Sequence, residues 1–252
     1  MTPLDPQLFP RRIQNRFPPT NGADIAFLAS DDTGAIFYCK EDSNGRHVRA
    51  TELICTRLSS HLGFRTPAWS IMEENGETFF GSQHEISSAG PFVVQDFLTT
   101  PRTDELGRRY PFPGSYLAQT FVLDMFLGNS DRGLNNFLLV QDGRMNQVCL
   151  IDFVASHLTD LTSDRFPVAQ SATVLLRRRL LGVHDAFDAS AIEMVDRIGA
   201  VPKEEFLRYV DGTPEDWLDH SQREALSEVW GSPGFHNRLA TLRTRLLDGT
   251  LI

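Results

Sequence analysis

The sequence predicts an α+β chain with two lobes, in which a small antiparallel sheet with one helix precedes a mainly helical part that carries one β-hairpin. Three observations predict this organisation. Short β-type runs fill much of residues 24–98, whereas apolar residues at helical spacing fill most of the chain from residue 115 onward. A hairpin signal, Asp-Gly between two apolar runs, interrupts the helical part near residue 142. We therefore expect an N-terminal arm at residues 1–19, a first lobe at 20–98 and a second lobe at 99–252.

The first lobe begins with two predicted strands, residues 24–28 and 35–40, and the second of them ends in a lysine. Only two of the 24 lysine and arginine residues are lysines, Lys40 and Lys203. A lysine retained at the end of an apolar strand favours a compact ammonium group that contacts nucleotide phosphates. The alternative is a strand-end lysine whose charged head lies in water.

Residues 46–62 are predicted to form an amphipathic helix, because apolar residues recur every four positions up to Leu62 and Gly63 follows as a stop. Glu52 lies in the first turns of this helix, where its carboxylate could pair with Lys40 and fix it. Glu52 points away from the apolar stripe, so an ordinary surface glutamate is an equally good interpretation.

Two further segments of the first lobe are candidate nucleotide contacts. The turn at residues 18–23 contains Gly22, and we expect it to cover the phosphates. Residues 92–98 form an apolar run that predicts a strand leading into a hinge at residues 99–101. The backbone around Gln95 and Phe97 would then meet adenine.

The second lobe is predicted to be mostly helical. Residues 116–127 are too rich in apolar side chains for a surface helix, so we expect a buried helix that ends at Gly128. The run Arg177-Arg178-Arg179 favours a solvated helix face over a binding site. The remaining helices are predicted at residues 171–181, 189–198, 203–209, 221–230 and 235–247.

Three polar side chains bracket the hairpin, whose strands are predicted at residues 137–140 and 148–151. Asp131 lies on a loop, Asn136 follows five residues later, and Asp152 comes directly after the second strand. In phosphoryl-transfer enzymes of the protein-kinase type, the first Asp orients and deprotonates the attacking hydroxyl, while the Asn and the second Asp hold magnesium. Turn residues alone would make this segment an ordinary solvated loop. An Asp directly after a buried strand costs desolvation energy unless it is paired, which favours the functional interpretation.

With these residues in place, the sequence resembles the HipA-like kinases, bacterial relatives of protein and phosphoinositide kinases, and especially their compact group with little more than the kinase domain. The resemblance runs from about residue 20 to about residue 246. Its most specific pieces are Gly128-Asn-Ser-Asp131-Arg with Asn136-Phe, and Thr213-Pro-Glu-Asp-Trp217. Its departures are Gly133, where the family often has His, and Val154, where ordinary kinases have Gly. The absence of Gly-x-Gly-x-x-Gly and Ala-Pro-Glu segments excludes a conventional eukaryotic-type kinase.

The resemblance implies a bilobal protein-kinase-like fold and transfer of the γ-phosphoryl group from ATP, with Mg²⁺, to a serine or threonine of a protein. It leaves room for self-phosphorylation and for a regulatory or antitoxin-like partner. Two alternatives stay open. A small-molecule kinase would use the same three polar residues, and a nucleotide-binding pseudokinase or regulatory module would bind ATP without turnover.

Length, charge and cysteine content further limit the class of protein and its partners. The chain of 252 residues suffices for one two-lobed domain with a sizeable core. Its net charge of −9 argues against nucleic acid as a partner, since binding to phosphate backbones requires Lys and Arg. The three cysteines are widely spaced in apolar segments and indicate the reduced thiols of a cytoplasmic protein. No apolar run approaches the roughly 18 residues of a membrane span, so we expect no membrane insertion.

Overall fold

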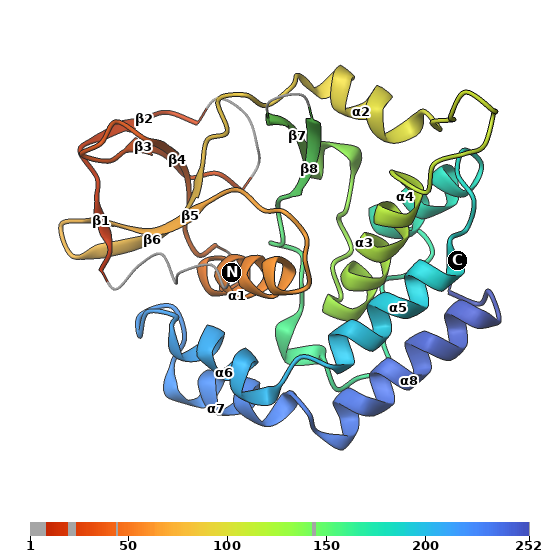
Figure 1. Ribbon diagram of the computed structural model, residues 1–252. Coiled ribbons are helices and arrows are strands. Elements are labelled where there is room, and N and C mark those ends of the chain that lie inside the picture. Colours follow the sequence, from red (N-terminus) through yellow and green to blue (C-terminus); the bar gives the residue numbers. More distant parts are fainter. Residues whose placement is uncertain (1–8, 20–23, 44, 143–144, 252) are drawn as a thin grey trace.

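The computed structural model describes residues 9–19, 24–43, 45–142 and 145–251. A sheet and one helix form the amino-terminal lobe, and a bundle of helices forms the carboxy-terminal lobe (Figure 1). A hairpin of β7 (Phe137–Asp142) and β8 (Met145–Leu150) lies between them. The two-lobed α+β organisation predicted from the sequence is confirmed.

The amino-terminal sheet has six strands in the order β1-β5-β6-β4-β3-β2. Only β1 pairs in parallel, with β5, and the other pairs are antiparallel. One face of the sheet encloses a small apolar core that includes Phe37 and Cys39. The strands are β1 (Arg11–Arg12), β2 (Asn15–Phe17), β3 (Phe27–Ser30), β4 (Ile36–Lys40), β5 (Trp69–Glu74) and β6 (Glu77–Gln83).

Helix α1 (Val48–His61) is buried between the sheet and the helical lobe (Figure 1). Its apolar residues Leu53, Ile54 and Leu58 belong to the large core that continues into the carboxy-terminal lobe. The helix was predicted with one exposed face, and the structure instead covers most of its circumference. By packing, α1 therefore belongs as much to the second lobe as to the first.

The carboxy-terminal lobe is built around α3 (Gly114–Leu127), whose apolar residues are almost all buried. Gly128 ends this helix with φ of 70°, a left-handed conformation that glycine adopts without steric cost, so the predicted stop is confirmed. Helices α5 and α8 pack against α3, and α6 and α7 lie below α1 (Figure 1). The other helices are α4 (Ala172–Leu181), α5 (Asp188–Gly199), α6 (Lys203–Asp211), α7 (His220–Val229) and α8 (Pro233–Leu247), with short 3₁₀ turns at η1 (Leu134–Asn136) and η2 (Leu158–Asp160).

The predicted strand at residues 92–98 is wrong, because these residues form helix α2 (Pro91–Thr99). Pro91 occupies the first turn, where its missing N–H group costs nothing. The buried residues Val94, Phe97 and Leu98 follow the i, i+3, i+4 spacing of a helix, whereas Phe92 is exposed. The β-branched, aromatic composition of the run concealed this spacing.

The structure also differs from the sequence predictions at the N-terminal arm and at the arginine run of α4. Residues 11–17, assigned to an N-terminal arm, contribute β1 and β2 to the two edges of the sheet. In the arginine run of α4, Arg178 and Arg179 are exposed, but Arg177 is buried and its guanidinium donates a hydrogen bond to the carbonyl of Ala186. Only part of that run is therefore a solvated face.

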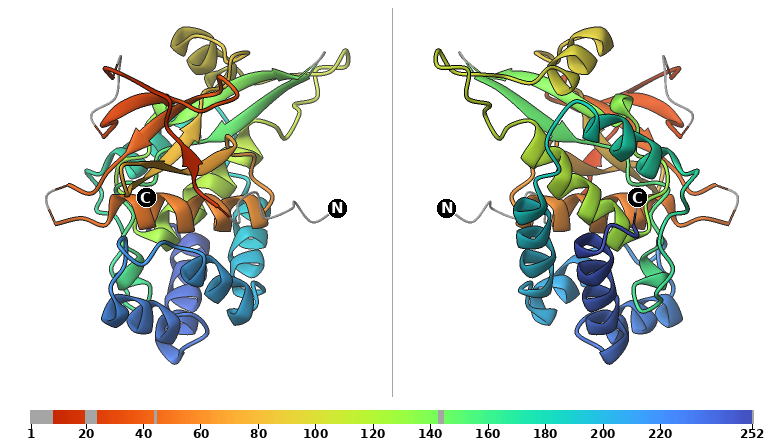
Figure 2. Two further views of the ribbon diagram at one scale, coloured as in Figure 1. Left: turned by 90° about the vertical axis from the view of Figure 1, so that its left-hand side faces the viewer. Right: turned by 90° about the vertical axis from the view of Figure 1, so that its right-hand side faces the viewer.

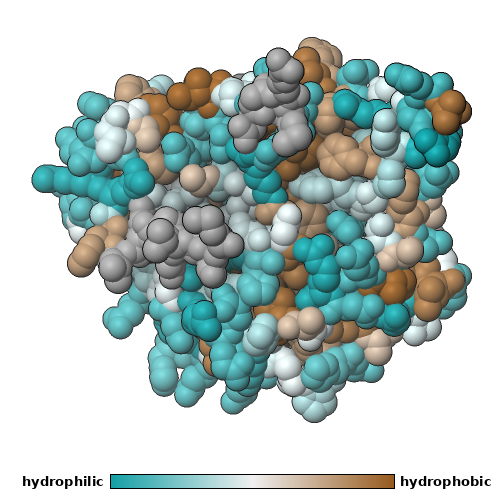
Figure 3. All heavy atoms as spheres, viewed as in Figure 1, coloured by the Kyte–Doolittle hydropathy of each residue, from teal (hydrophilic) through white to brown (hydrophobic). Residues whose placement is uncertain are grey.

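The connection between β6 and α2 docks on the hairpin. Ser88 forms a β-bridge with Val140, and the N–H of Ala89 donates to the carbonyl of Leu139 over 2.8 Å. Figure 2 shows α2 and the hairpin at one end of the molecule and α6–α8 at the other. The upper rim of the molecule carries apolar surface (Figure 3). Phe92 of α2 is exposed. Among the described residues, no helix combines the length and apolar character that crossing a membrane requires.

Candidate active site

The three polar residues that bracket the hairpin meet at one cavity. Asp131, Asn136 and Asp152 all line it, together with Asn129 and the first-lobe residue Arg46. Sequence positions 21 residues apart are brought together because η1 and the β7–β8 hairpin return the chain to the loop that follows α3. The predicted clustering of these residues is therefore present in the structure.

The loop that carries Asp131 is held by its own polar groups. The side-chain amide of Asn136 donates to the carbonyl oxygen of Asp131 over 2.8 Å, and the N–H of Asp131 donates to Oδ1 of Asn129 over 3.2 Å. The Asp131 side chain is exposed, and its carboxylate accepts no hydrogen bond within the described part of the chain. The Asp131 carboxylate is therefore available to a hydrogen-bond donor that enters the cavity.

Beneath the loop lies a buried group of four residues, Asp124, Asn129, Arg132 and Thr173, here called the loop-anchor cluster. Arg132 and Asp124 form a two-pronged ion pair, with Nε to Oδ2 at 2.8 Å and Nη2 to Oδ1 at 2.9 Å. Oδ1 of Asp124 also accepts from the amide of Asn129 at 2.8 Å. The hydroxyl of Thr173 donates to the carbonyl of Asn129 and accepts from the N–H of Arg132. Two parallel N–H···O bonds fix orientation as well as distance, so this pair sets the conformation of the loop.

Arg132 also connects the loop to the end of the hairpin. Its Nη1 donates to the carbonyl of Asn136 over 3.0 Å and to the carbonyl of Ile151. The guanidinium lies 5.0 Å from the ring centroid of Phe153, a distance at which cation–π attraction contributes. One buried side chain thus fixes the backbone next to both Asn136 and Asp152.

A second charged group, here called the cleft cluster, consists of Lys40, Glu52 and Asp152. Nζ of Lys40 donates to Oε1 of Glu52 at 2.7 Å and to Oδ1 of Asp152 at 2.9 Å. The same Oε1 of Glu52 accepts the N–H of Phe153 over 2.8 Å. Lys40 and Glu52 are almost fully buried, whereas 32% of the Asp152 side chain is exposed. Neither the water-facing lysine nor the surface glutamate considered from the sequence is present.

The charges of the cleft cluster depend on one another. Burial alone would lower the pKa of Lys40, but the carboxylates of Glu52 and Asp152 outweigh it and raise that pKa above its usual value. Burial would raise the pKa of Asp152, yet the ammonium of Lys40 and the nearby Arg132 hold it below its usual range. Burial raises the pKa of Glu52, and Lys40 offsets part of the shift. At neutral pH, Lys40 is charged and Asp152 is ionised.

The backbone at Asp152 is in an uncommon conformation. Its φ is 64°, in the left-handed region that few residues other than Gly, Asn and Asp adopt. Such conformations persist where the surroundings enforce them, and they concentrate at functional sites. Here the enforcing contacts are the bonds from Lys40 to the Asp152 carboxylate and from Phe153 to Glu52.

The donor atoms at the cavity suit magnesium. Asn136 uses its amide nitrogen on the backbone of Asp131, which leaves its amide oxygen available. Asp152 uses Oδ1 on Lys40 and is partly exposed, which leaves its second oxygen available. Amide and carboxylate oxygens are hard ligands, and Mg²⁺ typically takes one or two from the protein and the rest from phosphates and water. The residues present therefore fit a magnesium–nucleotide complex.

The other predicted nucleotide contacts are not all brought to the cavity. Gly22, in the turn expected to cover the phosphates, lies outside the described residues. The strand on which the assignments of Gln95 and Phe97 depended is absent, and Phe97 is buried in α2. The Gln95 side chain donates to Oδ1 of Asn135 over 3.4 Å. The segment that connects the lobes beside the hairpin is instead residues 84–90.

Sequence reasoning missed the loop-anchor cluster, although a signal was present. Asp124 stands inside the apolar run Phe121-Val-Leu-Asp-Met-Phe-Leu127, and a carboxylate within a buried helix requires a cationic partner. In the sequence, Arg132 stands out only as the residue that follows Asp131 in the family motif. Pairing Asp124 with Arg132 would have required knowing that the loop folds back under α3.

Comparisons with known proteins identify the family and the fold. A family model described as HipA-like kinase matches residues 12–230. The crystal structure of the Helicobacter pylori proinflammatory kinase CtkA superposes with a TM-score of 0.60 at 12% identity, covering 95% of this chain and 99% of that one. This likeness confirms the protein-kinase-like fold. No sequence among curated proteins matches the chain.

Two more distant structures align over most of this chain. A chain of the Shewanella oneidensis MR-1 toxin–antitoxin complex of HipA, HipB and operator DNA has a TM-score of 0.46 at 13% identity, with 93% of this chain and 62% of that chain covered. The Golgi casein kinase with Mn/ADP bound has a TM-score of 0.47 at 13% identity, with 94% and 73% covered.

Proposed function

The chain belongs to the HipA-like kinase family, and we propose that it transfers the γ-phosphoryl group of ATP to a hydroxyl group, with a serine or threonine of a protein as the acceptor. One observation carries this proposal. The exposed carboxylate of Asp131 and the magnesium-type ligands Asn136 and Asp152 line one cavity, and Lys40 is hydrogen-bonded to Asp152. Positioning and charge neutralisation are what phosphoryl transfer requires of a protein.

Asp131 is assigned to the acceptor. Its carboxylate would accept the proton of the attacking hydroxyl and orient the oxygen toward the γ-phosphorus atom. The support is its exposure at the cavity and the rigid backbone on either side, which Asn129 and Asn136 fix by hydrogen bonds. A rigid support matters because a displacement of about 1 Å from the productive geometry can reduce the rate about a hundredfold.

Lys40 is assigned to the phosphates. An ammonium group has three N–H donors, and Lys40 uses two of them on Glu52 and Asp152. The third donor is available to a phosphate oxygen. Glu52 keeps the ammonium in place, since it is buried and also bonded to the backbone of Phe153.

Asn136 and Asp152 would hold Mg²⁺, which when bound neutralises the charge on the phosphate oxygens. Their positions depend on Arg132, which fixes the carbonyl of Asn136 and that of Ile151, the residue before Asp152. The protein acceptor is supported by the family and by the exposure of Asp131, which the side chain of a large partner can reach.

The test is transfer from γ-³²P-labelled ATP with Mg²⁺ to candidate proteins and to small molecules, using the wild type and Asp131→Asn. We expect label in protein bands, and a rate about 10²- to 10⁴-fold lower in the variant, because a general base contributes that much. Label in soluble metabolites alone would replace the protein acceptor with a small molecule. Unchanged transfer by Asp131→Asn would refute its role.

A further inference from the structure

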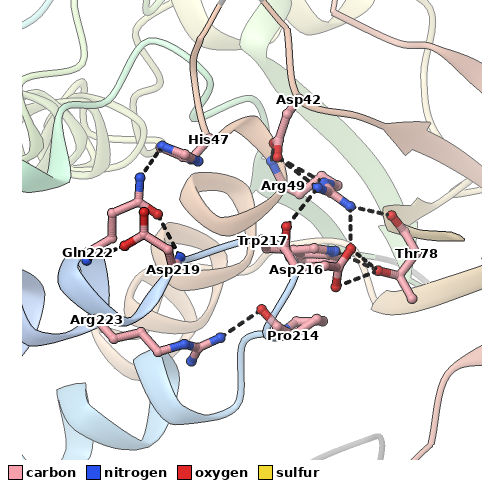
Figure 4. Close-up of polar contacts among 10 residues, drawn as sticks. All are labelled: Asp42, His47, Arg49, Thr78, Pro214, Asp216, Trp217, Asp219, Gln222 and Arg223. Carbon is pink, nitrogen blue, oxygen red and sulfur yellow. Dashed lines mark hydrogen bonds and ion pairs between the residues drawn. The ribbon is translucent and has the colours of Figure 1, made fainter.

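The segment between α6 and α7 runs from the carboxy-terminal lobe to α1 and β6 of the first lobe (Figure 4). It comprises residues 213–218 and is called the interlobe strap below. We propose that this strap is a positioning element, which holds Glu52 and Lys40 in register by fixing α1 and β6 to each other. The inference rests on the proposed function only where it concerns nucleotide binding.

The strap reaches the first lobe through the side chains of Asp216 and Trp217, and through the carbonyl of Asp216, which accepts from Nη2 of Arg49 at 3.2 Å. Oδ2 of Asp216 lies 2.9 Å from Nη1 of Arg49, at the start of α1, and 3.0 Å from the hydroxyl of Thr78, at the start of β6. The indole Nε1 of Trp217 donates to the same Thr78 hydroxyl over 2.7 Å. Nη1 of Arg49 also donates to the carbonyl of Thr78 over 2.8 Å. Helix, strand and strap therefore meet at a single polar junction (Figure 4).

This junction is close in sequence to both members of the Lys40–Glu52 pair. Arg49 precedes Glu52 by three residues, about one turn of the same helix. Thr78 precedes Phe80 by two residues, and Phe80 is the β-ladder partner of Lys40. A shift of α1 relative to β6 would thus move Glu52 away from Lys40. Because both charges are buried, their separation would leave uncompensated charge in the interior, which is strongly unfavourable.

The strap is itself held rigidly. Arg223 of α7 donates to four carbonyls of the strap and the residues before it. Those of Val210, Thr213 and Pro214 lie at 2.7–2.8 Å and that of Leu218 lies at 3.3 Å. Figure 4 shows the bond to Pro214. Trp217 is only 1% exposed. The strap can therefore restrict the movement of α1, since the position of the strap is set by the second lobe and not by α1 itself.

The opposite end of α1 also contacts the second lobe. The guanidinium of Arg57 lies 5.0 Å from the ring centroid of Tyr209 in α6, and Nδ1 of His61 lies 3.8 Å from Oε1 of Glu205. Helix α1 is therefore held at both ends by α6 and the strap. This arrangement predicts that Glu52 stays paired with Lys40 before any nucleotide binds.

The chain offers an internal reporter, because its only two lysines are Lys40, which is buried, and Lys203, which is exposed. Acylation by an amine-reactive reagent, followed by peptide mass spectrometry, gives the ratio of Lys40 to Lys203 labelling. Asp216→Ala should raise this ratio about fivefold, the effect of losing a part-exposed ion pair and a hydrogen bond. Trp217→Phe should raise it less, because it removes one hydrogen bond and keeps the ring.

Two variants serve as controls. Glu215→Ala removes an exposed negative charge from the adjacent position, and Glu215 makes no hydrogen bond or ion pair with any described residue. It should leave the ratio unchanged. Asp216→Asn keeps an acceptor for Thr78 and should restore part of the protection. The proposal that the strap positions Lys40 and Glu52 would be wrong if the labelling ratio rose equally in Asp216→Ala and Glu215→Ala, or did not rise in Asp216→Ala.

Affinity for Mg²⁺–ATP then separates positioning from a general loss of stability. Asp216→Ala should weaken binding about fivefold in the wild-type background and have no further effect in Glu52→Gln, because the strap acts through Glu52. Equal effects in both backgrounds would contradict this. If the wild type binds no ATP, the proposed function fails, and the labelling ratio alone still decides whether the strap fixes Lys40.

Discussion

Two groups of buried charges lie on either side of the Asp131 loop, and they differ in what their polar atoms still offer. In the loop-anchor cluster, both oxygens of Asp124 are occupied by Arg132 and Asn129, and both members of the ion pair are at most 2% exposed. In the cleft cluster, Lys40 retains one donor and Asp152 one oxygen, and Asp152 faces the cavity. Both clusters contain buried charges, but in the cleft cluster a donor of Lys40 and an oxygen of Asp152 are left without a hydrogen-bond partner among the described residues.

The difference teaches that a buried ion pair does not by itself mark an active site. In the loop-anchor cluster, the ion pair between Asp124 and Arg132 fixes the backbone, because Arg132 also donates to the carbonyls of Asn136 and Ile151. In the cleft cluster, one N–H donor of Lys40 and one carboxylate oxygen of Asp152 are left without a partner among the described residues. Substitutions should therefore affect folding in one cluster and ligand binding in the other.

The largest effect is expected for Asp124→Ala. Removing this carboxylate leaves the Arg132 guanidinium buried without its ion-pair partner, which typically costs about 3–5 kcal/mol. The free energy of unfolding, measured by urea denaturation, should fall by that amount. The matched control is Asp152→Asn, which removes the charge and keeps a residue type that tolerates the left-handed backbone at this position. Lys40 keeps its bond to Glu52, so the expected loss is about 1 kcal/mol. Equal losses in the two variants would remove the distinction between the clusters.

A second variant sharpens the comparison by separating folding from function. Replacing both members of the buried pair, as Asp124→Leu with Arg132→Met, should recover about 1–4 kcal/mol relative to Asp124→Ala, because no uncompensated charge remains. Phosphoryl transfer should nevertheless stay low, since the carbonyls of Asn136 and Ile151 lose their common donor. Recovery of stability together with wild-type phosphoryl transfer would show that the Asp124–Arg132 pair is not needed to position Asn136 and Asp152.

The fold was largely accessible from the sequence because its main elements carry strong local signals. The apolar density of α3 with its glycine stop and the Asp-Gly between the strands of the hairpin are examples. The sequence predicts a strand in place of helix α2 because Phe92, Val93 and Val94 have β-type composition, while the helical spacing of Val94, Phe97 and Leu98 spans only about one turn. Strands β1 and β2 have only two and three residues, and long-range pairing defines them.

The candidate site was accessible in part for the same reason. Asp131, Asn136 and Asp152 lie close in sequence around a hairpin, so spacing alone brings them together. The environment of Glu52 was not accessible, because it depends on the sheet and the second lobe closing over α1. Likewise, nothing local to residues 213–218 indicates that Asp216 and Trp217 reach Arg49 and Thr78.

The smallest predicted effect concerns pH. Asp152 has a lowered pKa, so its contribution to stability is present above its usual value of 3.8 and is lost as the pH falls through the lower value of the folded state. Lys40 has a raised pKa, so its contribution is present below 10.5 and is lost only as the pH rises beyond that. The stability difference between the wild type and Asp152→Asn, about 1 kcal/mol, should stay constant from about pH 5 to about pH 9. A difference that changes steadily across this range would contradict the assigned charges.

The most direct test of the central claim is the affinity for ATP, measured by calorimetry with and without Mg²⁺, in the wild type, Asp131→Asn and Asp152→Asn. We predict Mg²⁺-dependent binding in the wild type, nearly the same affinity in Asp131→Asn, and loss of the Mg²⁺-dependent part in Asp152→Asn. Binding in Asp152→Asn that still strengthens with Mg²⁺ as in the wild type would contradict the account, because the metal would then be held elsewhere.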